Sequence, residues 1–393
     1  MRCGFMIVGV ALVLAGSALA QVNLPEGFEI VEFAVNDKMT RSPAINNCGE
    51  IVYVKDNKQD SRVFLYDNGK ITRLTDDDQG RLVSHPDIND DGTIVWGRGY
   101  FNQMKTFRII MLRNGEQTVV GTGNGPSINS SGHMAWELFR RFTCHPEVDI
   151  VFFDGESAIE LTDNRFNDQS AQINNDDWIT WGESDGCVLP WVGDVRLYVD
   201  GEIYVLPSGS TQSQGPTINN LDQTAWSAGL PIRGIEFWKN GETVVLIDNG
   251  SNPRLNNLGD TYFLRFHPEN NNSWDSWLYW VSKGGPAIHR LTDDNVWNAD
   301  GDINDWVEMA WRWAEDPPHV NWRGGIRFLR RFRTGDAEFD GDIDLIDYAA
   351  FAECMTGPGR VDRLCDCRFL DIDHDGDVDL GDFALFQNGF MGR

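Results

Sequence analysis

Residues 86–96 read Pro-Asp-Ile-Asn-Asp-Asp-Gly-Thr-Ile-Val-Trp, and this stretch returns, imperfectly, six more times along the chain. Each copy has a small or polar lead-in, an apolar residue followed by asparagine, a polar turn, and an alternating apolar run that ends at an aromatic residue. A spacing of about forty residues between such turn-and-strand units is typical of a β-propeller. The six further copies are Pro43–Val54, Pro126–Trp136, Gln172–Trp181, Pro216–Trp226, Pro253–Phe263 and Asp302–Trp311.

A second half completes each unit, and it is clearest in Val63–Thr75. There, Asn68-Gly69 separates two alternating apolar runs, which is a strong hairpin signal because both turn residues accept positive φ. We therefore expect each unit to contain one strand from its first half and a hairpin from its second half. Such a unit cannot bury both faces alone, so neighbouring units must stack as blades. The matching second halves are Ile109–Val120, Ile150–Thr162, Val195–Leu206, Ile235–Ile247 and Leu278–Thr292.

The two ends of the repeat region predict how the ring closes. The last unit ends at Ile326–Phe332 without a clear final strand, whereas Phe28–Phe33 alternates like a strand before the first full unit. We expect this N-terminal strand to complete the last blade, because closure removes two free sheet edges. The predicted fold is mainly β, a propeller of about seven blades over residues 21–333. Six or eight blades remain alternatives, because Pro268–Asp275 lengthens the sixth unit.

The first twenty residues predict export. Arg2 precedes the apolar run Phe5–Leu14, and Ala18-Leu19-Ala20 has the small residues of a signal-peptide cleavage site, so residues 1–20 are expected to be a signal peptide. No later segment approaches eighteen uninterrupted apolar residues, so we expect no membrane insertion. The expected location of the mature chain is therefore secreted, either extracellular or periplasmic.

The net charge excludes some classes of binding partner, and the number of cysteines permits disulfide bonds. The 60 acidic and 33 basic residues give a net charge of −27, which argues against nucleic acid and anionic membranes as partners. Removal of the signal peptide would leave six cysteines, an even number that permits disulfides in an oxidising compartment. We expect Cys354 to pair with Cys365 or Cys367. A Cys144–Cys187 bridge is a weaker expectation.

Residues 334–393 differ in composition, with 15 acidic and 4 basic residues. Their carboxylates fall at alternate positions and at the twelfth position of two loops with glycine at the sixth, a pattern that gathers hard oxygen ligands around calcium. Each loop precedes an apolar, helix-like run, so we expect a small α-helical domain that is ordered by about two calcium ions. The expected ligands are Asp336, Glu338, Asp340, Asp342, Asp344 and Asp347 in the first loop, and Asp371, Asp373, Asp375, Asp377, Asp379 and Asp382 in the second.

Two family resemblances follow from these motifs. The units of residues 21–333 resemble TolB-type propeller repeats of bacterial exported proteins. The paired loops of residues 334–393 resemble a type I dockerin, and more closely the dockerin-like tails of planctomycete-type exported proteins. This resemblance implies calcium binding and a cohesin-like partner for the tail. The chain departs from the dockerin pattern at Glu338, in its linker cysteines, and at Leu345-Ile346 and Leu380-Gly381, where a Ser-Thr pair is common.

The repeat itself explains most of the distinctive residues. The histidines show no metal-ligand spacing, and no cluster of nucleophile, base and orienting residue stands out, so the sequence predicts no catalytic site. We therefore expect a monomeric binding scaffold for a protein or glycan ligand rather than an enzyme. The alternative is a carbohydrate-active enzyme, a glycoside hydrolase of polysaccharide degradation, that carries a dockerin.

Aromatic residues that recur at the strand ends are expected to pack between blades; they are Trp96, Trp136, Trp181, Trp226, Phe263 and Trp311.

Ligand binding in such a ring is expected at loops of variable length, because loops tolerate change while the strands hold the core. We expect the most variable ones to form a binding surface if they share one face of the ring. These are Phe101–Thr106, Phe139–Glu147, Asp185–Gly193, His267–Asp275 and Ala314–Arg323.

Overall fold

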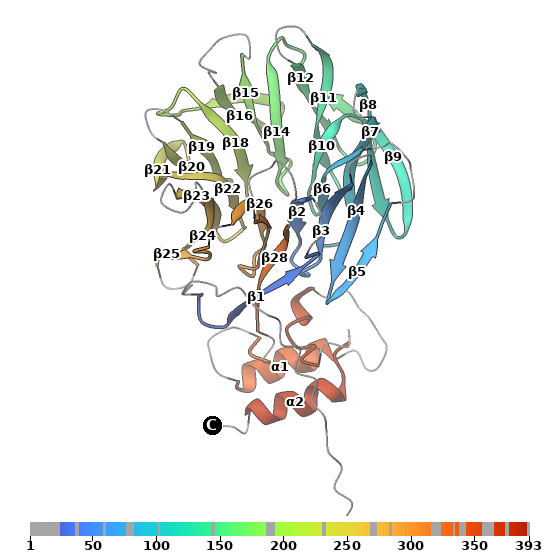
Figure 1. The fold of residues 1–393 in the computed structure, drawn as a ribbon, viewed down its shortest axis with the longest axis vertical. Helices are drawn as coiled ribbons and strands as arrows, with labels where there is room; N and C mark the ends of the chain where they lie inside the picture. The colour runs from blue at the N-terminus through green and yellow to red at the C-terminus, as the bar shows by residue number, and fades with distance from the viewer. Residues whose placement is uncertain are drawn as a thin grey trace, which may run out of the picture.

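A computed structural model shows a mainly β protein, with a ring of antiparallel strands and a small tail of two helices (Figure 1). The expected signal peptide, residues 1–20, lies outside the residues that the structure describes. No helix within those residues is long and apolar enough to cross a membrane. The described residues are 24–35, 39–57, 60–75, 82–100, 103–142, 146–185, 193–229, 233–267, 273–282, 285–294, 296–315, 324–332, 335–337, 343–355, 365–373 and 377–390.

The strands follow one another in units of four. Unit 1 contains β2 (Thr40–Ile45), β3 (Ile51–Asn57), β4 (Asp60–Asp67) and β5 (Lys70–Arg73). Unit 2 contains β6 (Leu82–Ile88), β7 (Ile94–Tyr100), β8 (Gln103–Arg113) and β9 (Glu116–Thr122). Unit 3 contains β10 (Asn124–Ile128), β11 (Met134–Phe142), β12 (Pro146–Phe153) and β13 (Ala158–Glu160). Unit 4 contains β14 (Asn167–Ile173), β15 (Ile179–Ser184), β16 (Gly193–Val199) and β17 (Glu202–Leu206).

The remaining strands repeat this order, and the fourth strand of the last unit comes from the N-terminal part of the chain. Unit 5 contains β18 (Ser213–Ile218), β19 (Thr224–Ala228), β20 (Gly234–Lys239) and β21 (Glu242–Asp248). Unit 6 contains β22 (Gly250–Leu255), β23 (Thr261–His267), β24 (Ser273–Trp280) and β25 (Ala287–Arg290). Unit 7 contains β26 (Trp297–Ile303), β27 (Met309–Ala314), β28 (Gly324–Arg331) and β1 (Phe28–Phe33).

Sheet pairing follows these units. The described strands form five four-stranded sheets and one eight-stranded sheet. The eight-stranded sheet joins units 3 and 4 through one parallel pair, Val148 with Asn167. In unit 7, β1 runs antiparallel to β28. The prediction that Phe28–Phe33 completes the last unit is therefore confirmed.

The prediction of three strands in each unit was wrong, because the lead-in before each asparagine is itself the innermost strand. In unit 1 this strand, β2, is the edge of its sheet, so Pro43 removes no ladder hydrogen bond. A bulge also interrupts each innermost strand, which hides the alternation that would identify it. The bulged residues with positive φ are Ser42, His85, Gly125, Ser170, Gly215, Asn252 and Asp300.

Hydrophobic cores lie between neighbouring units, as expected for stacked blades. Trp136 of unit 3, for example, packs with Val95 and Ile109 of unit 2 and with Met134 of its own unit. The prediction that the recurring aromatics fill these cores is confirmed, because each is at most 1% exposed. Four indole N–H groups find acceptors inside the ring, those of Trp136, Trp181, Trp226 and Trp311.

Seven asparagines join the first turns of the units around the central channel. Each side-chain amide donates to the main-chain carbonyl of the matching asparagine in the next unit, over 2.9–3.1 Å, and Asn304 returns to Asn46. Each side-chain oxygen accepts a main-chain N–H four residues further on. We call this end of the ring the turn face and the opposite end the loop face. The asparagines are Asn46, Asn89, Asn129, Asn174, Asn219, Asn256 and Asn304.

The tail contains α1 (Leu345–Cys354), a short 3₁₀ turn η1 (Cys365–Cys367) and α2 (Leu380–Phe390). Phe351 and Phe386 form its core, with ring centroids 5.1 Å apart. The Cys354–Cys367 disulfide confirms one of the two expected pairings. Cys144 and Cys187, whose bridge was the weaker expectation, lie outside the described residues.

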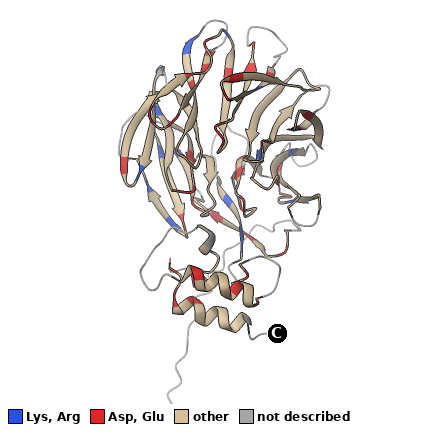
Figure 2. Ribbon diagram, turned by 180° about the vertical axis from the view of Figure 1, so that it is seen from behind, with Lys and Arg blue, Asp and Glu red and all other residues tan. Residues whose placement is uncertain are grey.

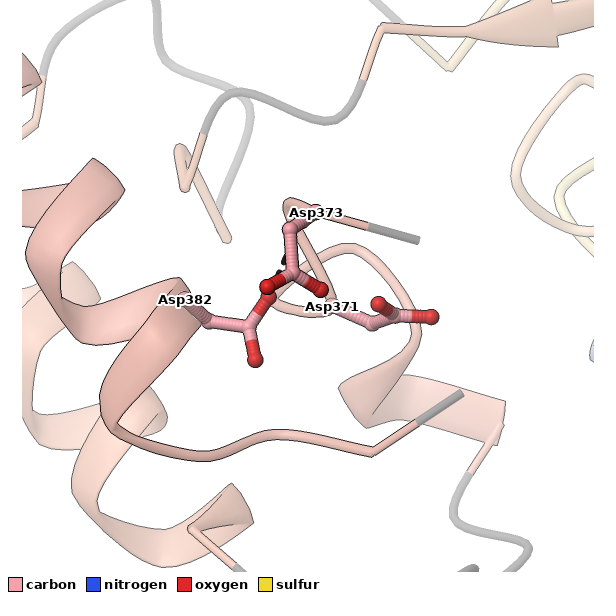
Figure 3. A group of neighbouring side chains, drawn as sticks. All are labelled: Asp371, Asp373 and Asp382. Atoms are coloured by element: carbon pink, nitrogen blue, oxygen red, sulfur yellow. Dashed lines mark hydrogen bonds between the residues drawn. The ribbon is translucent and has the colours of Figure 1, made fainter. Parts of the chain in front are cut away.

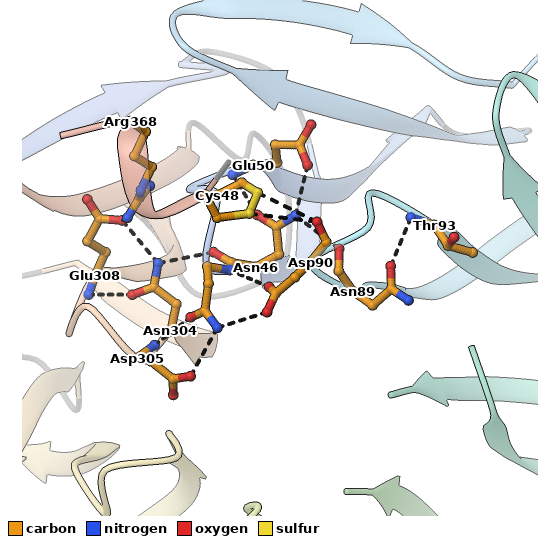
Figure 4. Close-up of a disulfide and its surroundings, with 12 residues drawn as sticks. Asn46, Cys48, Glu50, Asn89, Asp90, Thr93, Asn304, Asp305, Glu308 and Arg368 are labelled. Atoms are coloured by element: carbon orange, nitrogen blue, oxygen red, sulfur yellow. Dashed lines mark hydrogen bonds and ion pairs between the residues drawn. A yellow bond between two sulfur atoms is a disulfide. The ribbon is translucent and has the colours of Figure 1, made fainter. Parts of the chain in front are cut away.

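A second disulfide, which sequence analysis did not anticipate, joins the tail to the turn face. It links Cys48, in the first turn of unit 1, to Cys365 of η1 (Figure 4). Beside it, the Arg368 guanidinium pairs with Glu308 of unit 7. Gly49 has a φ of +71°, and a Cβ at this position would overlap the Arg368 guanidinium, so any other residue would adopt a strained φ and displace Arg368 from its present position.

Two further contacts hold the tail against the ring. Phe369 packs on Trp306 of unit 7 with ring centroids 4.9 Å apart. Asn68 of unit 1 donates to the Asp371 carboxylate over 3.4 Å. The tail is thus attached to units 1 and 7, the two units at which the ring closes (Figure 1).

Candidate functional site

The two acidic loops of the tail are built alike at their ends. Asp347 accepts hydrogen bonds from the N–H groups of Ala337 and Asp344, over 2.6 and 2.7 Å. Asp344 in turn caps the start of α1 by accepting the Ile346 N–H over 2.7 Å. Three expected ligands of this loop, Glu338, Asp340 and Asp342, lie outside the described residues.

The second loop repeats these bonds 35 residues later. Asp382 accepts the N–H groups of Ile372, Asp373 and Asp379 over 2.5, 3.1 and 2.9 Å. Asp379 accepts the Gly381 N–H over 2.6 Å, as Asp344 does for Ile346. The aspartate at the twelfth position of each loop lies in the first turn of the following helix, and its carboxylate accepts main-chain hydrogen bonds from near both ends of the loop.

Carboxylates of the second loop converge on Asp382. One oxygen each of Asp371, Asp373 and Asp382 lies within 4.8 Å of the others, and the same holds for Asp377, Asp379 and Asp382. Figure 3 shows the carboxylates of Asp373 and Asp382 facing each other. Asp375 lies outside the described residues. The donors are all hard oxygens, the type that calcium prefers, so these residues fit a calcium ion.

Acidic residues are not confined to this loop. Figure 2 shows them at the starts of both tail helices and dispersed over the ring. In the central channel, a cavity of about 180 Å³ near the turn face is lined by inner-strand residues of every unit. The residue before the Ile-Asn or Leu-Asn pair is charged in three units, as Asp87, Arg254 and Asp302. At the same position Ala44 and Ser127 are neutral, so an alignment of the copies would have singled out the charged three.

The channel carboxylates bind the backbone of neighbouring units. Asp302 of unit 7 accepts the Ile45 N–H of unit 1 over 2.9 Å, and Asp87 of unit 2 accepts the Ile128 N–H of unit 3 over 2.9 Å. Desolvation raises the pKa of Asp302 to about 7, and the nearby charge of Asp87 acts in the same direction, against the Ile45 hydrogen bond and the Arg254 charge. Desolvation also raises the pKa of Asp87. These groups therefore serve the ring structurally, and their charge costs stability at high pH.

Replacing Asp302 with asparagine is expected to stabilise the protein at pH 8. The folded-state pKa of Asp302, about 7, lies above that of the unfolded chain, so the protonated form favours folding and stability falls as pH rises through 7. Asp302→Asn keeps an oxygen for the Ile45 N–H and removes the charge. We expect a gain of about 1–3 kcal/mol at pH 8 and little change at pH 4, measured by urea unfolding at both values.

The matched control is Asp154→Asn. Hydrogen bonds from the Ser157 and Glu156 N–H groups lower the pKa of Asp154, so its charged form favours folding. That variant should gain nothing at pH 8. Equal stability of Asp302→Asn and the native chain at both pH values would contradict the role assigned to desolvation.

The loop face carries two adjoining cavities. One, of about 590 Å³, lies between units 5 and 6 and is lined by Gln212, Gln214, Arg233, Phe266 and Trp274 among others. The second, of about 260 Å³, lies between units 4 and 5 and shares Gln212 and Gln214 with the first. We call the larger one the interblade groove. The variable loop His267–Asp275, expected from the sequence to contribute to binding, includes Trp274, whereas no feature of the sequence selects Arg233, whose place in the groove depends on the folded ring.

The five variable loops also lie toward the loop face. Each joins the second and third strands of a unit, and antiparallel strands place this connection opposite the asparagine turn. Part of each loop lies outside the described residues, namely residues 101–102, 143–145, 186–192, 268–272 and 316–323.

Comparisons with known proteins show the fold of the ring. No protein-family model and no curated protein sequence matches this chain. The β-propeller domain of the trilobed protease from Pyrococcus furiosus is 12% identical, with a TM-score of 0.54 over 75% of this chain and 96% of that chain. That domain is described as having an open velcro topology, whereas here β1 completes the sheet of unit 7.

Two further solved structures are similar. A streptogramin B lyase is 12% identical, with a TM-score of 0.53 over 77% of this chain and 98% of that chain. TolB from Acinetobacter baumannii is 12% identical, with a TM-score of 0.44 over 62% of this chain and 64% of that chain. At such identities the likeness shows fold and not activity. The chain is thus a mainly β protein whose ring is similar in fold to β-propellers.

Proposed function

We propose that this protein is an exported recognition scaffold, a seven-bladed TolB-type propeller with a dockerin-like tail that calcium orders. The observation that carries the proposal is that two clusters of aspartate side chains in the second loop share Asp382. The hydrogen bonds that Asp382 accepts from the main chain have counterparts at Asp347 in the first loop. Seven asparagines in one closed ring of hydrogen bonds support seven blades. The disulfides and the signal-like first twenty residues support export.

Calcium would bind within each loop and bring its carboxylates together. Without a cation, close carboxylates repel one another, so binding should favour the ordered loop. In the second loop the chain would supply Asp371, Asp373, Asp377, Asp379 and Asp382, together with Asp375. We propose about two ions for the tail, one in each loop.

A partner surface for the tail would lie beside these loops and away from the ring. Leu345 and Ile346 at the start of α1 are 72% and 59% exposed, and Leu380 at the start of α2 is 72% exposed. Among the tail residues that contact the ring, Cys365, Arg368 and Phe369 precede the second loop, and Asp371 is its first residue. A cohesin-like partner would therefore meet an apolar pair of helix starts in place of the usual Ser-Thr contacts.

Calorimetric titration of the full chain tests the calcium proposal. We expect about two ions per chain, falling to about one in Asp373→Asn and in Asp382→Asn. Asp382 accepts three main-chain N–H groups, so its replacement could also disturb the loop, whereas exposed Asp373 provides a variant of the second loop that keeps these contacts to Asp382.

The control for this titration is Glu353→Gln, which removes a charge from α1 outside both loops. It should bind as many ions as the native chain. Unchanged stoichiometry in both aspartate variants would refute the assignment of calcium to the second loop. The same protein should be assayed for release of reducing sugars, since turnover would support the glycoside hydrolase alternative.

A further inference from the structure

We propose that the interblade groove binds an acidic oligosaccharide, with Arg233 holding a sugar carboxylate and Phe266 and Trp274 packing on a sugar ring. This inference rests on the proposed recognition function and names its ligand class. The cavity, about 590 Å³, falls within the usual range for ligand sites, about 300–1,000 Å³. It is therefore large enough for more than one sugar unit.

An aromatic pair forms one wall of the groove. Phe266 and Trp274 are cross-strand partners on β23 and β24, and their ring centroids lie 5.2 Å apart at 57°. Trp274 also packs against the core between units 6 and 7, which holds it in place, while Phe266 remains 44% exposed. Exposed aromatic rings on a rigid support offer apolar area at low entropic cost, as the C–H face of a sugar requires.

Neutral hydrogen-bonding groups make up much of the remaining lining of the groove. Gln212 and Gln214 lie at the start of β18, and Ser227 and Ser251 lie on the strands beside them. The Ser227 hydroxyl accepts the Asn252 N–H over 2.8 Å, which fixes its position. Side-chain amides and hydroxyls can each donate and accept, and so can the hydroxyls of a sugar.

The positive charge of the groove favours an acidic saccharide over a neutral one. Although the chain carries 60 acidic and 33 basic residues, the described lining of this groove contains Arg233 and no carboxylate. Arg233 is exposed, and no ion pair joins its guanidinium to a carboxylate within the described part of the chain. A guanidinium binds a carboxylate through two parallel hydrogen bonds, so a uronic acid fits this position better than a neutral sugar.

Backbone geometry holds Arg233 at the groove in an uncommon conformation. Its φ is +56°, a value that bulky residues rarely adopt. Two main-chain bonds maintain it, from Arg233 N–H to the Gly229 carbonyl over 2.7 Å and from Asn249 N–H to the Arg233 carbonyl over 2.8 Å. An arginine where asparagine or glycine would be more stable is consistent with a function of the guanidinium itself.

The test is calorimetric binding of trigalacturonate to the full chain at low and moderate salt. Native protein should bind it more tightly than its methyl ester, and Arg233→Asn should reduce affinity about tenfold or more. Asparagine tolerates positive φ, so this variant should melt no lower than the native chain, which separates loss of charge from loss of fold. Phe266→Ala should also weaken binding about tenfold.

Matched controls lie elsewhere on the ring. Tyr204→Ala removes an aromatic ring that is 53% exposed on β17, and Arg73→Gln removes a charge from β5; neither should change binding. Equal affinity for the acid and its ester, or no effect of Arg233→Asn, would overturn the acidic-sugar assignment. If a neutral saccharide or a peptide binds instead, and Phe266→Ala weakens it, the recognition scaffold stands and this inference fails. Binding of no saccharide or peptide probe would overturn both.

Discussion

Removal of the Cys48–Cys365 disulfide is expected to lower the stability of the ring more than any other single change in the tail. The bond closes a loop of 317 residues. In the chain-entropy model, cross-linking so long a loop stabilises the folded state by about 6 kcal/mol, because it restricts the unfolded chain. We therefore expect Cys48→Ser/Cys365→Ser to unfold at markedly lower urea concentration, and its tail to melt separately from the ring.

Both cysteines should be replaced together. Cys365 and Cys367 occupy the same short 3₁₀ turn, so a free Cys365 thiolate could exchange with the neighbouring Cys354–Cys367 bridge. The control is Cys354→Ser/Cys367→Ser, whose bond spans 13 residues and is worth about 3 kcal/mol to the tail alone in the same model. An unchanged unfolding midpoint for the ring in Cys48→Ser/Cys365→Ser would show that the Cys48–Cys365 disulfide adds nothing to the stability of the ring.

Asn219→Ala is expected to destabilise the ring by about 3–5 kcal/mol. Asn219 is 2% exposed, and its amide donates to the Asn256 carbonyl and to Gln223, both over 2.9 Å. Its side-chain oxygen accepts the Leu221 and Gln223 N–H groups over 3.0 and 3.1 Å. Alanine leaves these buried polar groups without their partner, and each such loss costs about 1–3 kcal/mol. The same loss opens the asparagine ring between units 5 and 6.

Ser130→Ala provides the control for this prediction. Ser130 follows Asn129 on the same turn face but is exposed, and its main-chain N–H, which alanine keeps, donates to Asn175 over 3.0 Å. We expect a change below about 0.5 kcal/mol for this variant in urea unfolding. A cost for Asn219→Ala that is equally small would mean that water replaces the asparagine bonds, and the ring would then owe its closure to the apolar cores alone.

Most of the ring could be predicted from sequence because its determinants are local and repeated. The Asn-Gly hairpins, the recurring Trp96 position and the alternation of Phe28–Phe33 each depend on a few adjacent residues, and repetition distinguishes them from chance. The innermost strands could not be recognised in this way, since a bulge at positions such as Ser42 breaks their alternation. Four strands in each unit became clear only when the pairing was seen.

Features that join distant residues were decided by the tertiary structure. The acidic loops are visible in the sequence because their expected ligands lie within twelve residues, whereas Cys48 and Cys365 are 317 residues apart and connectivity does not follow from spacing. The groove likewise combines Gln212 and Arg233 of one unit with Phe266 of the next. Sequence alone determined the repeat, its closing strand and the acidic loops, because each is a short-range pattern. The Cys48–Cys365 disulfide, the position of the charged residues in the channel and the interblade groove all depend on which parts of the chain become neighbours. Only the tertiary structure determines those neighbours.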